Sequence, residues 1–176
     1  VSEGVQDSGG RPVAATLVST LAFSLPAAAD GTATAQYLSG RLTVEVSGSG
    51  DVSMQLRLPM TRATVETKDK QDFTQEEVLS RLKAADKLFV FPAGAKCQVE
   101  SANAFAVDTQ GKITKGDGNV QAMYRFACAG GAAAVNKIKF AVFEGLPGLE
   151  ALKVQISTDK GEKNLDMTAA NSDVTL

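Results

Sequence analysis

Cys97 and Cys128 are the only two cysteines in this 176-residue chain, and they are the first candidates for side-chain chemistry. Both follow an N-terminal apolar segment of the kind that directs secretion. In an oxidising compartment two thiols form a disulfide, so the sequence predicts a structural bond between Cys97 and Cys128. Neither belongs to a Cys-x-x-Cys pair, the spacing typical of redox catalysis. The alternative is a free reactive thiol.

The chain contains no histidine. Neutral imidazole is the usual zinc ligand in proteins, and thiolate comes second. With imidazole absent and both thiols oxidised, a metal site would depend on carboxylates and water, which suit calcium or magnesium. The candidate carboxylates show no spacing that resembles a known metal-binding loop; they are Glu45, Glu66, Asp69, Asp72, Asp117 and Asp159. We therefore predict no metal ligands and no cofactor, and interpret these residues as solvated surface groups.

The sequence also lacks the residue combinations that usually carry out catalysis. A nucleophile needs an activating base, most often histidine, and no Ser or Thr stands beside a Lys at a strand-to-helix turn. The aromatic residues fall at the spacing of buried strands, although Tyr124 could offer a hydroxyl at a sheet edge; they are Phe89, Phe91, Tyr124, Phe126, Phe140 and Phe143. We predict no catalytic residues and a protein that is not an enzyme.

Composition and charge narrow the class of partner. The chain is 44% hydrophobic and 22% charged, which fits one globular domain with a single core. Its net charge is −2 and its isoelectric point is about 5.2, so no basic field attracts nucleic acid or anionic lipid. Lys and Arg are scattered along the sequence. We predict no nucleic-acid partner.

The N-terminus is typical of a secretion signal. Val13–Leu25 is an uncharged and mostly apolar run, and Pro26–Ala29 ends in the small residues that signal peptidase recognises. We predict residues 1–29 as a signal peptide and residues 30–39 as a leader. The apolar run is shorter than the roughly 20 residues of a membrane span, so we expect a periplasmic protein without an integral membrane segment after processing. The alternative is a buried helix of the domain.

Alternating apolar and polar residues predict most of the strands. Residues 41–47 and 52–58 form a hairpin around a Gly- and Ser-rich turn. An apolar run at 88–91 ends at Pro92, and a single helical turn is expected near 132–136. Further strands are predicted at 97–102, 104–107, 120–128, 138–142, 152–156 and 165–167, and Val174 and Leu176 close the chain.

One helix is marked by local signals. Thr74 and Glu77 form a capping box, and Phe73 and Val78 occupy the positions of a hydrophobic staple. An apolar face then continues to about Asp86. About eight short strands and one helix, without regular alternation, indicate an α+β fold: a mainly antiparallel β-sheet built from hairpins, with one helix packed against it.

Three segments carry cysteine, aromatic and proline residues at a distinctive spacing. They are Leu88-Phe-Val-Phe-Pro-Ala-Gly-Ala-Lys-Cys97, Tyr124-Arg-Phe-Ala-Cys128 and Phe140-Ala-Val-Phe-Glu-Gly-Leu-Pro-Gly-Leu-Glu-Ala-Leu-Lys-Val-Gln155. Together they resemble the ZrgA-like proteins, a proteobacterial periplasmic family whose founding member is linked to zinc. The resemblance covers residues 40–176, which we expect to form a single domain.

The resemblance also implies histidines that this chain does not have. In the family they are typical of three regions, which correspond here to residues 36–40, 61–66 and 120–122, and none of these positions is histidine. The family's zinc ligands therefore cannot be assigned to residues of this chain.

Two functions remain open. The resemblance implies a small exported periplasmic binding or accessory protein of a zinc-linked family, with metal binding lost or weak in this member. The alternative is a structural or protein-interaction module with no small-molecule ligand, docking a periplasmic protein through a sheet edge or an apolar face.

Overall fold

The computed structural model describes residues 40–60, 73–114 and 118–176. The predicted signal peptide, the leader and the charged segment 61–72 lie outside these residues. Within them, strand β1 (Gly40–Val46) and strand β2 (Val52–Pro59) form the predicted hairpin. Leu42, Val44 and Val46 are buried and the residues between them are not, because the alternate residues of a strand face opposite sides of the sheet.

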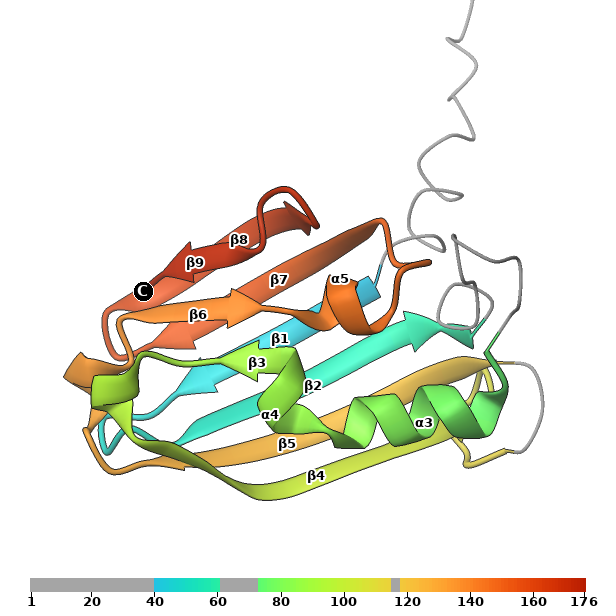
Figure 1. Ribbon diagram of the computed structural model, residues 1–176, viewed down its shortest axis with the longest axis horizontal. Helices are drawn as coiled ribbons and strands as arrows, with labels where there is room; N and C mark the ends of the chain where they lie inside the picture. Colours follow the sequence, from blue (N-terminus) through green and yellow to red (C-terminus); the bar gives the residue numbers. More distant parts are fainter. Residues whose placement is uncertain (1–39, 61–72, 115–117) are drawn as a thin grey trace, which may run out of the picture.

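The hairpin lies in the middle of a six-stranded sheet with the order β4-β5-β2-β1-β7-β8 (Figure 1). The remaining strands are β4 (Cys97–Val107), β5 (Asn119–Cys128), β7 (Ala151–Thr158) and β8 (Gly161–Thr168). Every pairing in this sheet is antiparallel except that of β1 with β7, which is parallel. The prediction of a mainly antiparallel sheet is confirmed, and the parallel pair is an addition to it.

Strand β4 corrects one prediction. The segments 97–102 and 104–107 were expected as separate strands, but they form one strand paired with β5 along its whole length. The register shifts between Val99 and Ser101, so Glu100 is an extra residue at a β-bulge. The bulge lies inside the first predicted segment and does not coincide with the predicted break at Asn103, which pairs regularly with Met123.

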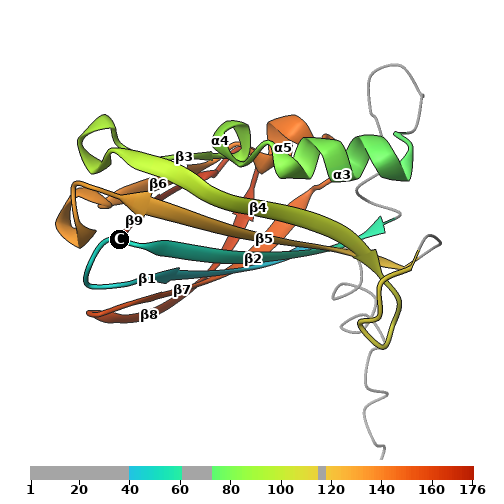
Figure 2. The same ribbon diagram turned by 90° about the horizontal axis from the view of Figure 1, so that it is seen from below.

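A second, three-stranded sheet packs over the first (Figure 2). Its order is β3-β6-β9, formed by β3 (Phe89–Val90), β6 (Lys137–Phe140) and β9 (Asp173–Thr175). We had expected one sheet, and a strand that continued to Val142. Instead helix α5 (Val142–Gly145) follows β6, because Val142 and Phe143 are both buried and two successive residues of a strand cannot both face the same core.

The predicted helix begins as expected and ends early. Helix α3 (Gln75–Lys83) starts with the capping box: the Thr74 N–H donates to Glu77 Oε2 at 2.7 Å, and the Glu77 N–H donates to Thr74 Oγ1 at 3.3 Å. Ala84 then leaves helical geometry, and a separate short helix α4 (Ala85–Leu88) follows. The expectation of one helix reaching Asp86 is therefore wrong at its end. Three short helices are present in the described residues, and the predicted turn near residue 132 is the 3₁₀ segment Ala132–Ala134.

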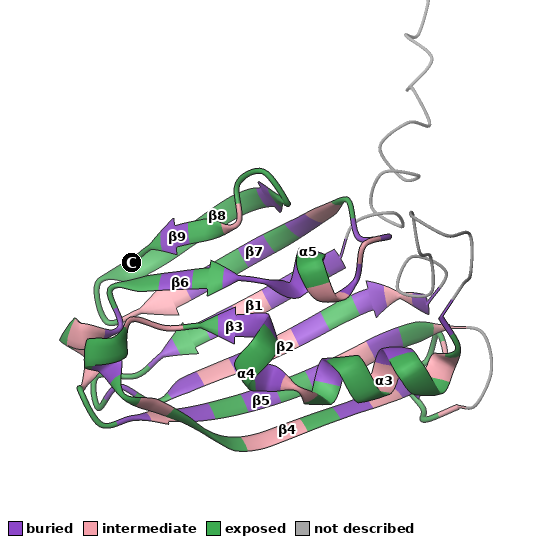
Figure 3. Cartoon of the chain, in the orientation of Figure 1, coloured by how far each residue is buried: buried purple, intermediate pink, exposed green. Residues whose placement is uncertain are grey.

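The core lies between the large sheet and the layer made of the small sheet and the helices (Figures 2 and 3). Buried residues alternate along β1, β2, β5 and β7 on the face toward that layer. We call the opposite face of the large sheet the outer face. No helix in the described ranges is long and apolar enough to cross a membrane.

Candidate functional site

The two cysteines form a disulfide that joins the start of β4 to the end of β5. Cys97 and Cys128 are directly opposite each other in the strand register. Two backbone hydrogen bonds continue the pairing beyond them, from Ala129 N–H to Lys96 O and from Gly130 N–H to Ala95 O. The bond therefore fixes a corner of the large sheet, and neither sulfur is available as a metal ligand.

The structure describes two of the six candidate carboxylates. Glu45 lies on the outer face of β1, and Asp159 lies in the turn between β7 and β8. The other four, Glu66, Asp69, Asp72 and Asp117, are outside the described residues. Among the residues that the structure describes, no three His, Cys, Asp or Glu side chains come close enough together to hold a metal ion.

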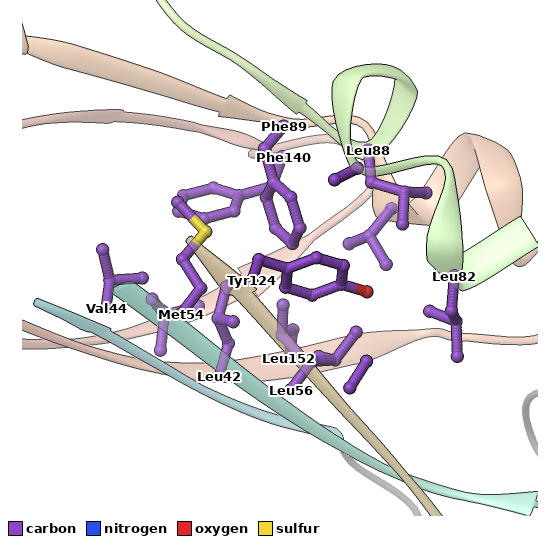
Figure 4. Packing of buried hydrophobic residues seen from close by; sticks show 14 of the residues in the cluster. Leu42, Val44, Met54, Leu56, Leu82, Leu88, Phe89, Tyr124, Phe140 and Leu152 are labelled. Carbon is purple, nitrogen blue, oxygen red and sulfur yellow. The ribbon is translucent and has the colours of Figure 1, made fainter. Parts of the chain in front are cut away.

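The aromatic residues form the centre of the core, as their spacing predicted (Figure 4). Phe89 is edge-on to Tyr124, Phe126 and Phe140, with ring centroids 4.9, 6.1 and 6.1 Å apart. Phe91 lies against Phe126 at 4.8 Å. These contacts are those of packed hydrophobic residues, not of a ligand platform.

Tyr124 corrects a further expectation, because its hydroxyl is not at a sheet edge. The side chain is 1% exposed, and its oxygen, drawn in red in Figure 4, lies inside the core and has no hydrogen-bond partner in the part of the chain that the structure describes. Burial raises the pKa of Tyr124 well above its ordinary value of 10.0, since the phenolate cannot be solvated there. The neutral phenol is thus held in the core, where a substrate has no access to it.

One apolar hollow opens at the edge of the two sheets, between β3 and β4. It has a volume of about 320 Å³ and is lined mainly by apolar residues, among them Val90, Phe91, Pro92, Val99 and Phe126. Asp86 and Lys96 are the charged residues of its lining. Val90 and Val99 are 46% and 41% exposed, so this edge offers apolar surface to the solvent.

Three basic residues meet on the outer face, and sequence analysis missed them. Arg57, Arg41 and Lys153 are direct neighbours across β2, β1 and β7, and all three are exposed. We call them the cation row. Gln121 continues the row beyond Arg57, and Asp166 ends it beyond Lys153. Arg41 and Arg57 face each other within the predicted hairpin, but Lys153 joins them only through the β1–β7 pairing, which has no local signal in the sequence.

The region of the chain that matches a protein family coincides with the region that forms the two sheets. The family described as "ZrgA family zinc uptake protein" matches residues 39–176, which include every described strand and helix. The chain belongs to this family. A search of curated proteins finds no match to it.

Proposed function

We propose that this chain is an exported periplasmic binding or accessory protein of zinc uptake, and that it holds zinc weakly or not at all. Membership of the zinc uptake family supports the link to zinc. The disulfide Cys97–Cys128 supports export to an oxidising compartment.

The absence of histidine from all 176 residues is the observation that carries the proposal. Since both cysteines are oxidised, the two commonest zinc ligands are missing. The cation row supports the same conclusion. The resemblance implies a family histidine near residues 120–122, and here Gln121 lies opposite Arg57, which in turn lies opposite Arg41; these positive charges oppose the binding of Zn²⁺.

Nothing in the described residues supports catalysis, so we propose a role without a reaction. The buried phenol of Tyr124 lies within the aromatic core, and the edge hollow is lined mostly by apolar side chains. A binding or accessory protein needs neither a nucleophile nor a general base.

Metal titration of the processed protein tests the proposal. We expect isothermal titration to give no stoichiometric zinc binding at neutral pH, and elemental analysis after dialysis to find substoichiometric zinc. Calcium and magnesium are titrated in parallel, because carboxylate sites prefer them. A site filled at 100 times its dissociation constant would stabilise the protein by about 2.7 kcal/mol, so a melting temperature raised by stoichiometric zinc would overturn the loss of metal binding.

Export has its own test. Osmotic shock should release the chain with the periplasmic fraction, and mass spectrometry should find Asp30 as the first residue of the mature protein. A chain that stays in the cytoplasm with residues 1–29 attached would contradict this part of the proposal.

A second function is favoured by the edge hollow: docking of another periplasmic protein at the edge between β3 and β4. The observation behind it is the exposure of Val90 and Val99 beside the hollow. A photo-crosslinker at position 99 should give one discrete adduct in living cells, which Val90→Ser reduces and which a crosslinker at position 163 on β8 does not give. Identical adducts from both positions would rule this function out.

A further inference from the structure

Two groups of residues that are distant in the sequence lie side by side on the outer face of the large sheet. The first is the cation row, which is roughly 10 Å long because neighbouring strands lie about 4.8 Å apart. The second is an apolar corner of the same face, made of Phe105, Met123 and Ile113. Met123 is 41% exposed and Ile113 is 71% exposed, the largest value among the exposed large hydrophobic residues of the described chain.

The strand register places the apolar corner beside the row. Phe105 is opposite Gln121, which is opposite Arg57, and Met123 is two residues from Gln121 on the same face of β5. Ile113 pairs with Val107, which has the same orientation as Phe105 because the two are two residues apart on β4. In Figure 2 the turn after β4 extends on the side of the sheet away from α3.

The cation row is unfavourable for the isolated domain. Like charges directly opposite each other destabilise a sheet, and here Arg41 has a cation on both sides. Asp166 lies opposite Lys153 at one end of the row, but no carboxylate lies opposite Arg41 or Arg57 in the strand register. None of the ion pairs between described residues involves a member of the row; those pairs are Arg125–Glu100, Lys137–Asp173 and Lys139–Glu144. Local conflicts of this kind are expected at functional surfaces, where an external group compensates the charge.

The net charge of −2 gives the chain as a whole no attraction to anionic lipid, but the cation row concentrates three positive charges on one face. We propose that the outer face docks on the surface of an anionic lipid bilayer. The cation row contacts the headgroups, and Ile113 and Met123 enter the boundary between headgroups and acyl chains. A fluid surface suits this face because mobile headgroups can collect under cations at any spacing. The edge hollow between β3 and β4 lies elsewhere, as does a further hollow against the β7–β8 turn, lined in part by Thr158 and Lys160.

The turn that carries Ile113 is already ordered for such a contact. The Asp108 carboxylate accepts hydrogen bonds from the Gln110 and Lys112 N–H groups at 2.8 and 2.9 Å. Asp108 N–H donates to Lys112 O at 2.9 Å, which closes the loop. The acidic side chain of this turn is thus engaged by the backbone, while Lys112 adds a cation next to the exposed isoleucine.

Vesicle co-sedimentation of the processed full chain tests the proposal. The vesicles are neutral phosphatidylcholine, or contain roughly one third phosphatidylglycerol, at roughly 0.02 M and 0.5 M NaCl. We expect binding only to the anionic vesicles, and weaker binding at high salt. Arg41→Gln/Arg57→Gln should lower the partition coefficient about fivefold per cation, and Ile113→Ser should lower it about tenfold.

The matched control is Lys83→Gln/Lys87→Gln, which removes the same charge from exposed positions on α3 and α4. It should bind like the wild type. Misfolding is separated by the melting temperature, which should stay level or rise in Arg41→Gln/Arg57→Gln because repulsion is relieved. Equal binding to neutral vesicles, no binding at low salt, or an equal loss in the control overturns the proposal. Row-dependent binding of poly-glutamate without vesicle binding also overturns it, since the partner would then be an acidic chain. None of these results bears on zinc, so the proposed function stands or fails separately.

Discussion

The ring of Phe89 is edge-on to the ring of Tyr124, with centroids 4.9 Å apart and planes inclined by 66°. Phe89 comes from the small sheet and Tyr124 from the middle of β5, so this contact joins the two layers of the fold. The ring of Tyr124 therefore stabilises the core, whereas its hydroxyl has no partner among the described residues. The two parts of one side chain have opposite effects on stability.

We predict that Tyr124→Phe stabilises the protein. A buried hydroxyl without a hydrogen bond loses its hydration on folding, and its removal should raise the free energy of unfolding by about 1–2 kcal/mol. Urea denaturation at neutral pH measures the change. Tyr124→Leu is the control: it also removes the hydroxyl but loses the ring contacts, so it should destabilise. A Tyr124→Phe variant less stable than the wild type would mean that the hydroxyl has a bound water or another partner.

Because its pKa is raised, the buried Tyr124 hydroxyl should make the protein less stable at alkaline pH. Burial raises the pKa of Tyr124 in the folded protein above the 10.0 of the unfolded chain, so the folded state holds this proton more tightly. Tyr124 therefore adds no pH dependence below pH 10, and above pH 10 it lowers the free energy of unfolding by up to about 1.4 kcal/mol per pH unit. Tyr124→Phe has no proton to lose and lacks this pH dependence. The gap in unfolding free energy between wild type and variant should widen between pH 9 and pH 11; a constant gap would refute the assignment.

Local patterns predicted the strands whose two faces differ and failed where contacts are distant. Alternation predicted β1, β2 and β5 because each has one buried face. The capping box of α3 was visible because its two residues are three apart. The β1–β7 pairing and the small sheet left no local signal, since their partners are far apart in sequence. The disulfide could be predicted although it is a distant contact, because the chain has only two cysteines, whereas Lys153 joins the cation row only through the β1–β7 pairing.

The capping box predicts a pH effect of the opposite sign. The Thr74 N–H bonded to the carboxylate holds the pKa of Glu77 below its ordinary value of 4.5. Its contribution is therefore present above that value and is lost as the pH falls through the lowered pKa. Glu77→Ala should lower the melting temperature at pH 7 but not at pH 2.5. Glu76→Ala, in the same helical turn but outside the box, should have a smaller effect at pH 7.

Removal of the disulfide should destabilise the domain. Cys97 and Cys128 are 31 residues apart, and closing such a loop stabilises by about 3–4 kcal/mol in the chain-entropy model. Cys97→Ala/Cys128→Ala should lose that amount, and dithiothreitol should lower the melting temperature of the wild type to a similar extent. The double variant itself should not respond to dithiothreitol. A wild-type melting temperature that dithiothreitol leaves unchanged would contradict a stabilising role for the bond.

Substitution by alanine should have different effects on stability at two glycines near the disulfide. A Cβ at Gly130 would overlap the backbone oxygen of Gly94, so one of the two turns must move. We expect Gly130→Ala to lower the free energy of unfolding by about 1–3 kcal/mol. A Cβ at Gly94 meets nothing within 4 Å, and Gly94→Ala should change stability by less than about 0.5 kcal/mol. Equal effects of the two substitutions would show that the turns can separate freely.

The parallel pairing of β1 with β7 also determines when the domain can fold. Strand β1 is complete at Val46, but one of its edges has no partner until Ala151–Thr158 has been synthesised. Until then the nascent chain exposes an open strand edge, and a product truncated before residue 151 would keep it. The large sheet can therefore be completed only after β7 has been synthesised, so β1 waits for a partner that comes far later in the chain.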